Sequence, residues 1–463
     1  PRESGHEEQI IAYLQNFAKT NNLECRTDSA GNVVITRNAS AGKENLPTVV
    51  LQSHSDMVCE KNGSSIHDFS KDPIKYEIED GWIIAKDTTL GADCGIGMAA
   101  QMAVLVDKNL NLPKIEALFT TEEETGLTGA KSLKPGFITG KYLINLDSED
   151  EGEIFIGCAG GIDTTARFIY SEKPVNEGSV FLELHINGAT GGHSGDDINK
   201  QRANAVQLLA ILLRRLNKKI EFELCQIDGG NKRNAIAREA WATIAVNKNL
   251  RTVTEDLFDT YINEIAKAYY VSDPQLGGTI VEAEFCKNAI DKNTASNLIL
   301  SLNACPHGVI AMSQDIPGFV ETSTNLASIK MNPDKVITVS TSQRSSLNSE
   351  RYNAAERIET VFVLAGAVAT HESEYPGWKP NPDSEILKAG KEAYKTLFGI
   401  DPIVRAIHAG LECGMFADIY PGLDMISFGP TLRGVHAPGE KLEIASVDKF
   451  WKLLIAILSN IKN

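Results

Sequence analysis

The sequence predicts an α/β fold with two domains, in which an α+β module interrupts a domain built on a parallel sheet. Three observations support this prediction. The chain has 463 residues, more than one hydrophobic core usually organises. Short apolar strands alternate with helical segments up to about residue 162, a pattern typical of parallel sheets. After Gly160 and Gly161 the pattern changes to alternating strand-like runs separated by long amphipathic helices.

The first helix is predicted from a capping pattern and from its periodicity. Ser4 and Glu7 have the spacing of a capping box, and apolar residues at 10, 11, 14, 17 and 18 fall on one helical face. A glycine-rich helix is expected at about 95–106. Strands are expected, in chain order, at 33–35, 48–51, 115–119 and 142–146.

The inserted α+β domain is predicted for residues 163–373. It contains strand-like runs at 181–186 and 336–339 and helices at 203–216 and 351–368. The stretch from Tyr375 to Pro382 is rich in proline and suits a return linker. The interrupted domain with the parallel sheet then comprises residues 1–162 and 374–463. Its last elements are expected as helices at 384–398 and 446–461 and strands at 403–406 and 425–428.

Bulk composition excludes several classes of protein. The formal net charge of −16 argues against a nucleic-acid partner, because phosphate binding needs a basic surface. We find no run of 18 apolar residues that would predict a membrane span, and no signal sequence at the start. The eight cysteines contain no C-x-x-C pair, which argues against a disulfide framework or a thiolate zinc site. We therefore expect a cytoplasmic protein with no nucleic-acid or membrane partner.

A histidine and an aspartate follow the predicted strand 48–51. In the extended segment His54-Ser55-Asp56 the two outer side chains point the same way, because side chains alternate along a strand. His54 could therefore bind a metal while Asp56 orients its imidazole. On its own this pair is more typical of a solvated surface turn.

Asp93 lies within a glycine-rich loop, residues 88–97, that opens a helix. Such loops often cradle phosphates, but the carboxylate of Asp93 would repel an anion. A carboxylate held in a tight loop suits a ligand that bridges two cations.

Further acidic residues and two late histidines complete the inventory. The strand 115–119 is followed by three acidic residues, Glu122, Glu123 and Glu124. A run of this kind is usually the solvated start of a helix. Here, after a buried strand, one Glu could bind a metal and its neighbour could act as a general base. Asp147 follows the strand 142–146. Either of two histidines near the end of the chain could close the site: His408 and His436.

These residue types match the needs of a two-metal hydrolase: a shared carboxylate, one histidine and one carboxylate for each ion, and a base. Imidazole together with carboxylate favours Zn²⁺, with Co²⁺ and Mn²⁺ as close competitors, over calcium or magnesium. Two such ions lower the pKa of a water and polarise a carbonyl group.

Taken together, the motifs resemble the metallopeptidase family that contains carboxypeptidase G, acetylornithine deacetylase and the bacterial dipeptidases. Within this family the chain looks most like the aminoacyl-histidine dipeptidases (Xaa-His dipeptidases). The likeness covers nearly the whole chain, and the ordered set of motifs is specific. The stretches that carry it are residues 53–58, 88–97, 123–130, 147–161, 188–205, 408–414 and 429–440.

The resemblance implies a zinc-peptidase-like α/β catalytic domain with an inserted α+β lid domain. It also implies a cofactor of two divalent metal ions, most simply Zn²⁺, with Co²⁺ or Mn²⁺ as alternatives. The implied ligands are His54 and Asp147 on one ion, Glu124 and His436 on the other, and Asp93 as the bridge.

The resemblance assigns other roles as well. Asp56 corresponds to the residue behind the histidine ligand, and Glu123 corresponds to the general base. In the lid, His193 lies in a Gly-Gly-His-Ser-Gly motif whose histidine stabilises the oxyanion. The implied substrate-binding residues are Asn234, Arg344, His408 and Glu412.

The implied function is that of a metal-dependent dipeptidase that hydrolyses Xaa-His or related dipeptides with a water activated by two metals. A sister tripeptidase or an N-acyl amino acid amidohydrolase would share every metal ligand. A non-catalytic binding protein of the same fold is disfavoured because Glu123 and all five ligands are present. The motif at 191–195 argues against an aminopeptidase. The expected partner is a small peptide, and a homodimer is left open.

Overall fold

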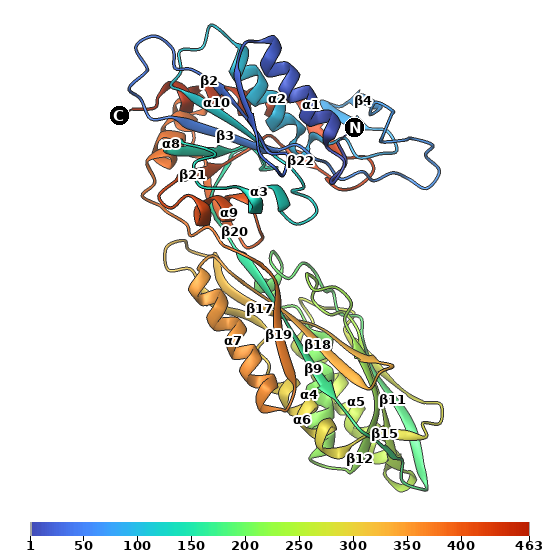
Figure 1. Ribbon diagram of the computed structural model, residues 1–463. Coiled ribbons are helices and arrows are strands. Elements are labelled where there is room, and N and C mark those ends of the chain that lie inside the picture. Colours follow the sequence, from blue (N-terminus) through green and yellow to red (C-terminus); the bar gives the residue numbers. More distant parts are fainter. Residues whose placement is uncertain (1, 463) are drawn as a thin grey trace. The chain divides into compact units, whose positions relative to one another are not determined.

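The computed structural model describes residues 2–462, which form two compact units (Figure 1). Unit 1 contains residues 2–158, 378–406 and 411–462. Unit 2 contains Ala159–Gly377 and Ile407–Gly410. The insertion boundaries expected from the sequence, 163 and 373, both fall inside unit 2. The catalytic and lid roles of the two units stay predictions.

Unit 1 is built on an eight-stranded mixed sheet. The central strands β6, β3, β7 and β21 run parallel to one another, whereas β2 and β8 pair antiparallel with β6 and β21. In sheet order the strands are β1 (Glu24–Thr27), β2 (Val33–Arg37), β6 (Ile115–Thr120), β3 (Val49–His54), β7 (Tyr142–Asn145), β21 (Asp424–Ser427), β8 (Glu153–Cys158) and β20 (Ile403–Ile407).

Unit 1 also contains a small antiparallel sheet and six α-helices. In sheet order the strands of the small sheet are β22 (Leu432–Arg433), β23 (Lys441–Glu443), β5 (Trp82–Ala85) and β4 (Tyr76–Glu79). The helices are α1 (Glu8–Thr20), α2 (Ala92–Val106), α3 (Thr128–Ser132), α8 (Glu385–Phe398), α9 (Glu412–Ile419) and α10 (Ile444–Ser459). Within residues 2–462, no helix is both long enough and apolar enough to cross a membrane.

The apolar runs of the sequence become the buried strands of unit 1. Every residue of β3, β6 and β7 is buried, as expected for parallel strands that are covered on both faces. Helices α1 and α2 lie side by side (Figure 1) and pack on this sheet through a cluster that includes Leu14, Ile35, Leu105 and Phe119. The two helices thereby fix the strands whose ends carry the candidate site.

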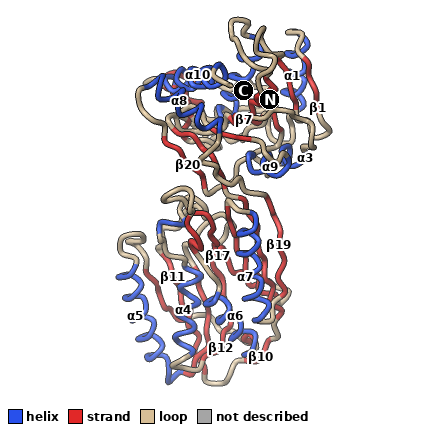
Figure 2. Tube along the Cα trace, turned by 90° about the vertical axis from the view of Figure 1, so that its left-hand side faces the viewer, coloured by secondary structure: helices blue, strands red, loops and turns tan. Residues whose placement is uncertain are grey.

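Unit 2 is an α+β layer built on a nine-stranded sheet. Figure 2 shows α5, α4, α6 and α7 in a row along this sheet, and one large apolar cluster joins the helices to the strands. In sheet order the strands are β14 (Gly277–Glu282), β11 (Ser179–Asn187), β13 (Ala240–Asn247), β12 (Phe222–Gly229), β17 (Val320–Asn332), β18 (Val336–Ser345), β9 (Gly160–Ile169) and β19 (Val368–Tyr375), with β16 (Gly308–Met312) beside β17. The other elements are the pair β10 (Glu172–Pro174) and β15 (Asn288–Ile290), α4 (Ala205–Asn217), α5 (Arg251–Ala268), α6 (Lys292–Ala304), α7 (Asn348–Leu364) and the 3₁₀ turns η1 (Ile198–Lys200) and η2 (Lys248–Leu250).

The expected helices and strands are confirmed, with two corrections. Helix α7 ends at Leu364 and not at 368, because Gly366 adopts φ +86° and the chain then enters β19. The capping box at the start of α1 is wrong. Ser4 Oγ donates to Asp56 Oδ2 at 2.7 Å, and Glu7 Oε1 accepts from the backbone N–H of Glu122 at 2.8 Å. Both side chains are bound to loops of unit 1 that follow β3 and β6.

Candidate metal centre

The candidate site begins at the carboxyl ends of three neighbouring parallel strands. Strand β3 ends at His54, β6 ends just before Glu122, and β7 ends two residues before Asp147. Because β6, β3 and β7 are adjacent and parallel, their carboxyl ends meet at one edge of the sheet, where open α/β sheets bind ligands.

His54 is the buried centre of this edge, with 1% of its surface exposed. Its Nδ1 lies 3.2 Å from the carbonyl oxygen of Asp56 and 3.3 Å from Oδ1 of the same residue. Its Nε2 lies 2.9 Å from Oδ1 of Asp93 and 3.3 Å from Oδ1 of Asp147. Asp56 therefore holds one ring nitrogen, and the other nitrogen faces two carboxylates.

Asp93 joins this group to a second one. Its other oxygen, Oδ2, lies 3.2 Å from Nε2 of His436. The same Nε2 lies 3.0 Å from the carboxylate of Glu124. The two oxygens of Asp93 thus face two different histidines, and each histidine faces a further carboxylate.

The donor atoms fit two cations. Ligands of one tetrahedral zinc lie about 3.4 Å from one another, from metal–ligand distances of about 2.0–2.2 Å. The N···O distances at His54 and at His436 span 2.9–3.3 Å, close to that spacing. Among residues 2–462, Oδ1 of Asp147 is also buried without a well-formed hydrogen bond. A cation at each histidine would satisfy these carboxylate oxygens.

The pKa values of the two histidines also fit bound cations. Burial alone lowers the pKa of His54, but the facing carboxylates, led by Asp147, raise it well above its ordinary value. Hydrogen bonds to Asp93 and Glu124 raise the pKa of His436 to about 10. Each imidazole therefore holds a proton between carboxylates in the metal-free chain, and a bound divalent cation would replace that proton.

Asp56 organises the loops around the first histidine. Its carboxylate accepts hydrogen bonds from Ser4 Oγ at 2.7 Å and from the backbone N–H groups of Glu123 at 3.1 Å and Glu124 at 3.2 Å. Burial acts to raise the pKa of Asp56, but these contacts and His54 lower it to about 2. Asp56 is thus an ionised acceptor that connects the loop after β3 to the loop after β6.

Glu123 lies beside the same donors. Its carboxylate, with Glu124 and His54, forms one of the groups whose ligand atoms lie within 4.8 Å of one another. Burial raises the pKa of Glu123 well above its ordinary value, and the carboxylates of Asp147, Glu412 and Glu124 raise it further. A carboxyl group in this environment accepts a proton readily.

Glu412 was expected near the substrate. The structure buries its carboxyl group in unit 1, where Oε2 accepts from Gln52 Nε2 at 2.5 Å and from Thr120 Oγ1 at 3.0 Å. Burial, assisted by the negative charge of Asp147, raises the pKa of Glu412 to about 8.

Two residues of this site were missed by the sequence reasoning. The guanidinium of Arg2 donates to the carbonyl oxygens of Ser55, Asp56 and Gly91, so it ties the loop after β3 to the loop of Asp93. The carboxylate of Glu440 binds backbone N–H groups of the same Asp93 loop. In the sequence, the one signal for a role of Glu440 in the site is its position four residues after His436.

Two of the expected substrate residues, Arg344 and His408, interact in unit 2 with His193, the residue expected to stabilise the oxyanion. His193, Arg344 and His408 are close enough that the charge of Arg344 lowers the pKa of both histidines, after the larger effect of burial. His408 is buried, and its Nε2 lies 2.7 Å from Ser323 Oγ. Asn234 has an exposed side chain, and its carbonyl oxygen accepts from the backbone N–H next to His193.

The local fold determines which nitrogen of His193 carries the proton. Its Nδ1 accepts from the backbone N–H groups of Gly195 and Asp196, both at 3.2 Å. Burial lowers the pKa of His193, which favours the neutral ring, so the remaining proton lies on Nε2. Gly195 is needed here, because a Cβ at this position would lie 2.2 Å from the carbonyl oxygen of His408.

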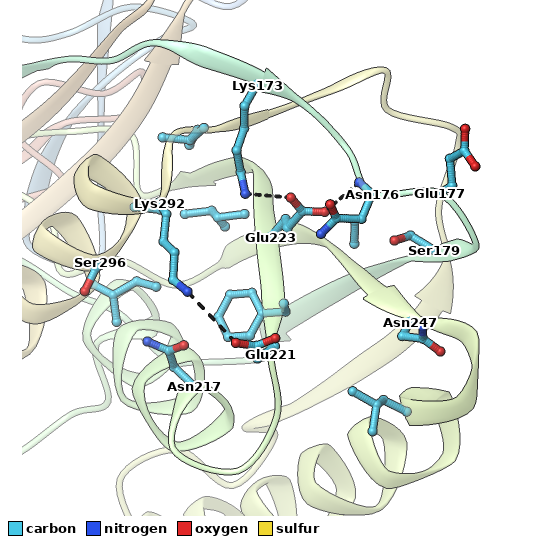
Figure 3. Close-up of a pocket in the computed structure, with 17 residues that line it drawn as sticks. Lys173, Asn176, Glu177, Ser179, Asn217, Glu221, Glu223, Asn247, Lys292 and Ser296 are labelled. Atoms are coloured by element: carbon cyan, nitrogen blue, oxygen red, sulfur yellow. Dashed lines mark hydrogen bonds and ion pairs between the residues drawn. The ribbon is translucent and has the colours of Figure 1, made fainter.

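A separate cavity of about 290 Å³ lies in unit 2 (Figure 3). None of the residues that line it is a candidate site residue. Four of its charged side chains form ion pairs, Lys173 with Glu223 at 2.7 Å and Lys292 with Glu221 at 4.0 Å. The lining contains no histidine or cysteine, so this cavity is not the metal centre.

Comparisons with known proteins identify the family of this chain. The family model described as "Peptidase family M20/M25/M40" matches residues 50–460. The cytosol non-specific dipeptidase of Escherichia coli (strain K12) is 40% identical over 461 residues, which cover 100% of this chain and 95% of that protein. The crystal structure of aminoacylhistidine dipeptidase from Vibrio alginolyticus superposes with a TM-score of 0.96 and 39% identity, covering 100% of this chain and 94% of the other.

A more distant structure shares the fold alone. The aminopeptidase PepT from Bacillus cereus has a TM-score of 0.56 and 18% identity, covering 99% of this chain and 94% of the other. The fold class and the family resemblance predicted from the sequence are confirmed. The chain therefore belongs to peptidase family M20/M25/M40 and is a peptidase.

Proposed function

We propose that this peptidase is a dipeptidase that works with two divalent metal ions, most simply Zn²⁺. The observation that carries the proposal is the position of Asp93, whose two carboxylate oxygens face His54 at 2.9 Å and His436 at 3.2 Å. A carboxylate shared in this way suits a bridging ligand of a two-metal site. Asp147 and Glu124 then complete the two ligand sets.

The metal-dependent part of the chemistry follows from the donor set. Imidazole and carboxylate ligands favour zinc, cobalt or manganese over calcium and magnesium. Bound ions of this kind polarise a peptide carbonyl and acidify a water molecule. Asp56 supports the site, because it orients His54 and holds the loop of Glu123 and Glu124.

Glu123 is the residue we propose as the general base. Its raised pKa suits a group that takes a proton from the attacking water and returns it to the leaving amine nitrogen. The backbone N–H of Glu123 is fixed by Asp56 at 3.1 Å, so the loop that carries the base is held in place.

Unit 2 supplies groups suited to the substrate, and we propose it as the lid. His193 presents Nε2–H as a donor, since its Nδ1 is already an acceptor, and we assign that donor to the oxyanion that forms during hydrolysis. Arg344 brings a positive charge, and its Nε is buried without a well-formed hydrogen bond among residues 2–462. We assign Arg344 and Asn234 to the terminal carboxylate of the peptide or the developing oxyanion, and His408 to the same substrate region.

The substrate class is proposed from the relatives. One is named a non-specific dipeptidase and the other an aminoacylhistidine dipeptidase. We propose dipeptides as the substrates, with Xaa-His among them. The relative from E. coli is named a cytosol enzyme, and we propose the cytoplasm for this protein as well.

A substrate panel tests the proposal. The metal-depleted protein is reloaded with zinc, manganese or cobalt and assayed on dipeptides, tripeptides and N-acyl amino acids. We expect metal-dependent turnover of dipeptides, including Xaa-His, and values of kcat/KM at least about tenfold lower for the other two classes. A preference for tripeptides or N-acyl amino acids, or turnover without metal, would overturn it.

A further inference from the structure

Glu440 connects two loops of the candidate metal centre. It lies four residues after His436, and only 2% of its surface is exposed. Its carboxylate accepts four backbone N–H groups from the loop that leads to Asp93. The donors are Leu90 at 2.7 Å and Gly91 at 2.9 Å to Oε2, and Ala92 at 2.8 Å and Asp93 at 3.4 Å to Oε1.

The Asp93 loop is shaped to receive an anion. Gly91 adopts φ +69°, and a Cβ there would lie 2.7 Å from Sδ of Met57, so this position requires glycine. The turn and the start of α2 direct consecutive N–H groups toward one point, as helix N-termini do for anions. Glu440 supplies that anion from a segment about 350 residues away in the chain.

The same side chain is not needed to hold its own hairpin together. Residues 434–440 form the tip between β22 and β23, and β23 pairs with β5 through its backbone. Further backbone hydrogen bonds join Gly439 to Thr88 at 3.0 Å and Ala85 to Glu440 at 3.0 Å. The carboxylate of Glu440 therefore adds a connection from the hairpin of His436 to the loop of Asp93.

This connection bears on one ligand pair. His436 is half exposed, and its contacts with Asp93 and Glu124 are made only by its side chain at the hairpin tip. His54, by contrast, lies at the end of a fully buried strand and is held by Asp56. A shift of the hairpin relative to the Asp93 loop would separate the groups at His436 and leave those at His54 in place.

We propose that Glu440 is a positioning residue that fixes the loop of Asp93 relative to His436, so that the cation site formed by Asp93, Glu124 and His436 depends on its carboxylate. This inference rests on the proposed two-metal function. Glu440 touches neither the substrate nor the ions; it acts through the backbone of the Asp93 loop.

The test compares zinc binding by the wild type, Glu440→Gln and Glu443→Gln. Glutamine keeps the size of Glu440 but replaces one acceptor oxygen with an N–H donor, so at least two of the four N–H groups lose their partner. Glu443 ends β23, three residues after Glu440, and its carboxylate has no hydrogen bond or ion pair among the described residues, so it is a matched control. Metal-depleted samples are titrated with Zn²⁺ by calorimetry, and their thermal unfolding is recorded without metal.

We expect the wild type and Glu443→Gln to bind two ions per chain. Glu440→Gln should bind its first ion with near wild-type affinity and its second on the order of 10- to 100-fold more weakly, the usual scale for an outer-shell partner. It should also keep a cooperative unfolding transition. If Glu440→Gln does not fold, Glu440→Asp keeps the charge at a shorter reach and should likewise weaken the second ion alone.

Two results would overturn the inference while leaving the proposed function intact. One is wild-type affinity for both ions in the Glu440 variants. The other is an equal loss at both sites together with a lower melting temperature, which indicates a purely structural helix cap. A wild type that binds fewer than two ions would contradict the proposed function itself, and the inference would fall with it.

Discussion

Asp56 accepts a hydrogen bond from the backbone N–H of Glu123 at 3.1 Å, so the carboxylate behind the first histidine also holds the loop of the proposed base. Because Asp56 contacts Nδ1 of His54 as well, it connects the orientation of a proposed metal ligand to the position of the proposed base. Through this double contact, we expect a residue outside the proposed ligand set to affect both metal binding and catalysis.

Asp56→Asn should weaken metal binding and turnover together. The amide keeps the size of the carboxylate but loses the negative charge that orients His54 and accepts two backbone N–H groups. We expect a loss of metal affinity on the order of 10- to 100-fold. Calorimetric zinc titration measures it, with the exposed residue Asp72, changed to Asn, as the control. Unchanged affinity in Asp56→Asn would argue against this role.

Glu123→Gln should separate metal binding from catalysis. The substitution removes the proton acceptor, and general-base contributions are typically ~100- to 10,000-fold in rate. Elemental analysis should still find two ions, because the proposed ligands are intact. Glu122 is the matched control: it precedes Glu123, and among the described residues its hydrogen bonds are made by its backbone, with Glu7 and Thr128, and not by its carboxylate. Glu122→Gln should keep wild-type turnover, and a Glu123→Gln enzyme within a few-fold of wild type would refute the assignment.

His193→Ala should lower kcat without changing metal content. Loss of one oxyanion donor usually costs on the order of 100- to 1,000-fold in turnover. The alternative is that His193 only stabilises its own turn through the N–H groups of Gly195 and Asp196. In that case the variant would show a lower melting temperature and nearly normal turnover of the folded enzyme. Kinetics and thermal unfolding on the same sample distinguish the two roles.

His307 should make unit 2 sensitive to acid. Its side chain is partly buried, and its Nδ1 accepts from the backbone N–H of Leu326 at 3.3 Å and faces Asn204 Nδ2 at 3.4 Å. Burial lowers its pKa to about 4, below the unfolded value of about 6.5. The unfolded chain therefore binds more protons between these values, so the stabilisation is complete above pH 6.5 and is lost as the pH falls toward 4.

His307→Asn checks this sign. Asparagine retains an acceptor near the position of Nδ1 but does not titrate. The pH dependence that His307 contributes, up to about 3 kcal/mol between pH 6.5 and 4, should be missing in the variant. The difference in unfolding free energy between the two proteins is measured by denaturant titration across this range. A difference that is independent of pH would contradict the expected titration.

Local patterns in the sequence were sufficient for most of the fold. The strands that lead to His54 and Asp147 are continuous apolar runs, and such runs identify buried parallel strands without knowledge of their partners. The small sheet was not predicted, because β4 is fully exposed and β22 has only two residues. Strand β22 is too short to show a pattern, and the apolar–polar alternation of β4 covers only four residues.

The site was predictable only where its residues occur in short motifs. His54 with Asp56, and Glu123 with Glu124, are close in the sequence and follow predicted strands. Arg2 and Glu440 act on loops 53 or more residues away, and nothing in their local sequence predicts those contacts. Ser4 was assigned to a helix cap for the same reason, because its actual partner, Asp56, is 52 residues away.

The most direct test of the account is a crystal structure of the zinc-loaded protein, with the ions located by anomalous scattering. We expect two ions roughly 3.5–4 Å apart, the separation of cocatalytic sites. Asp93 should bridge them, with His54 and Asp147 on one ion and Glu124 and His436 on the other, at about 2.0–2.2 Å. A single ion, or two ions with His408 as a ligand and His436 unbound, would contradict the account.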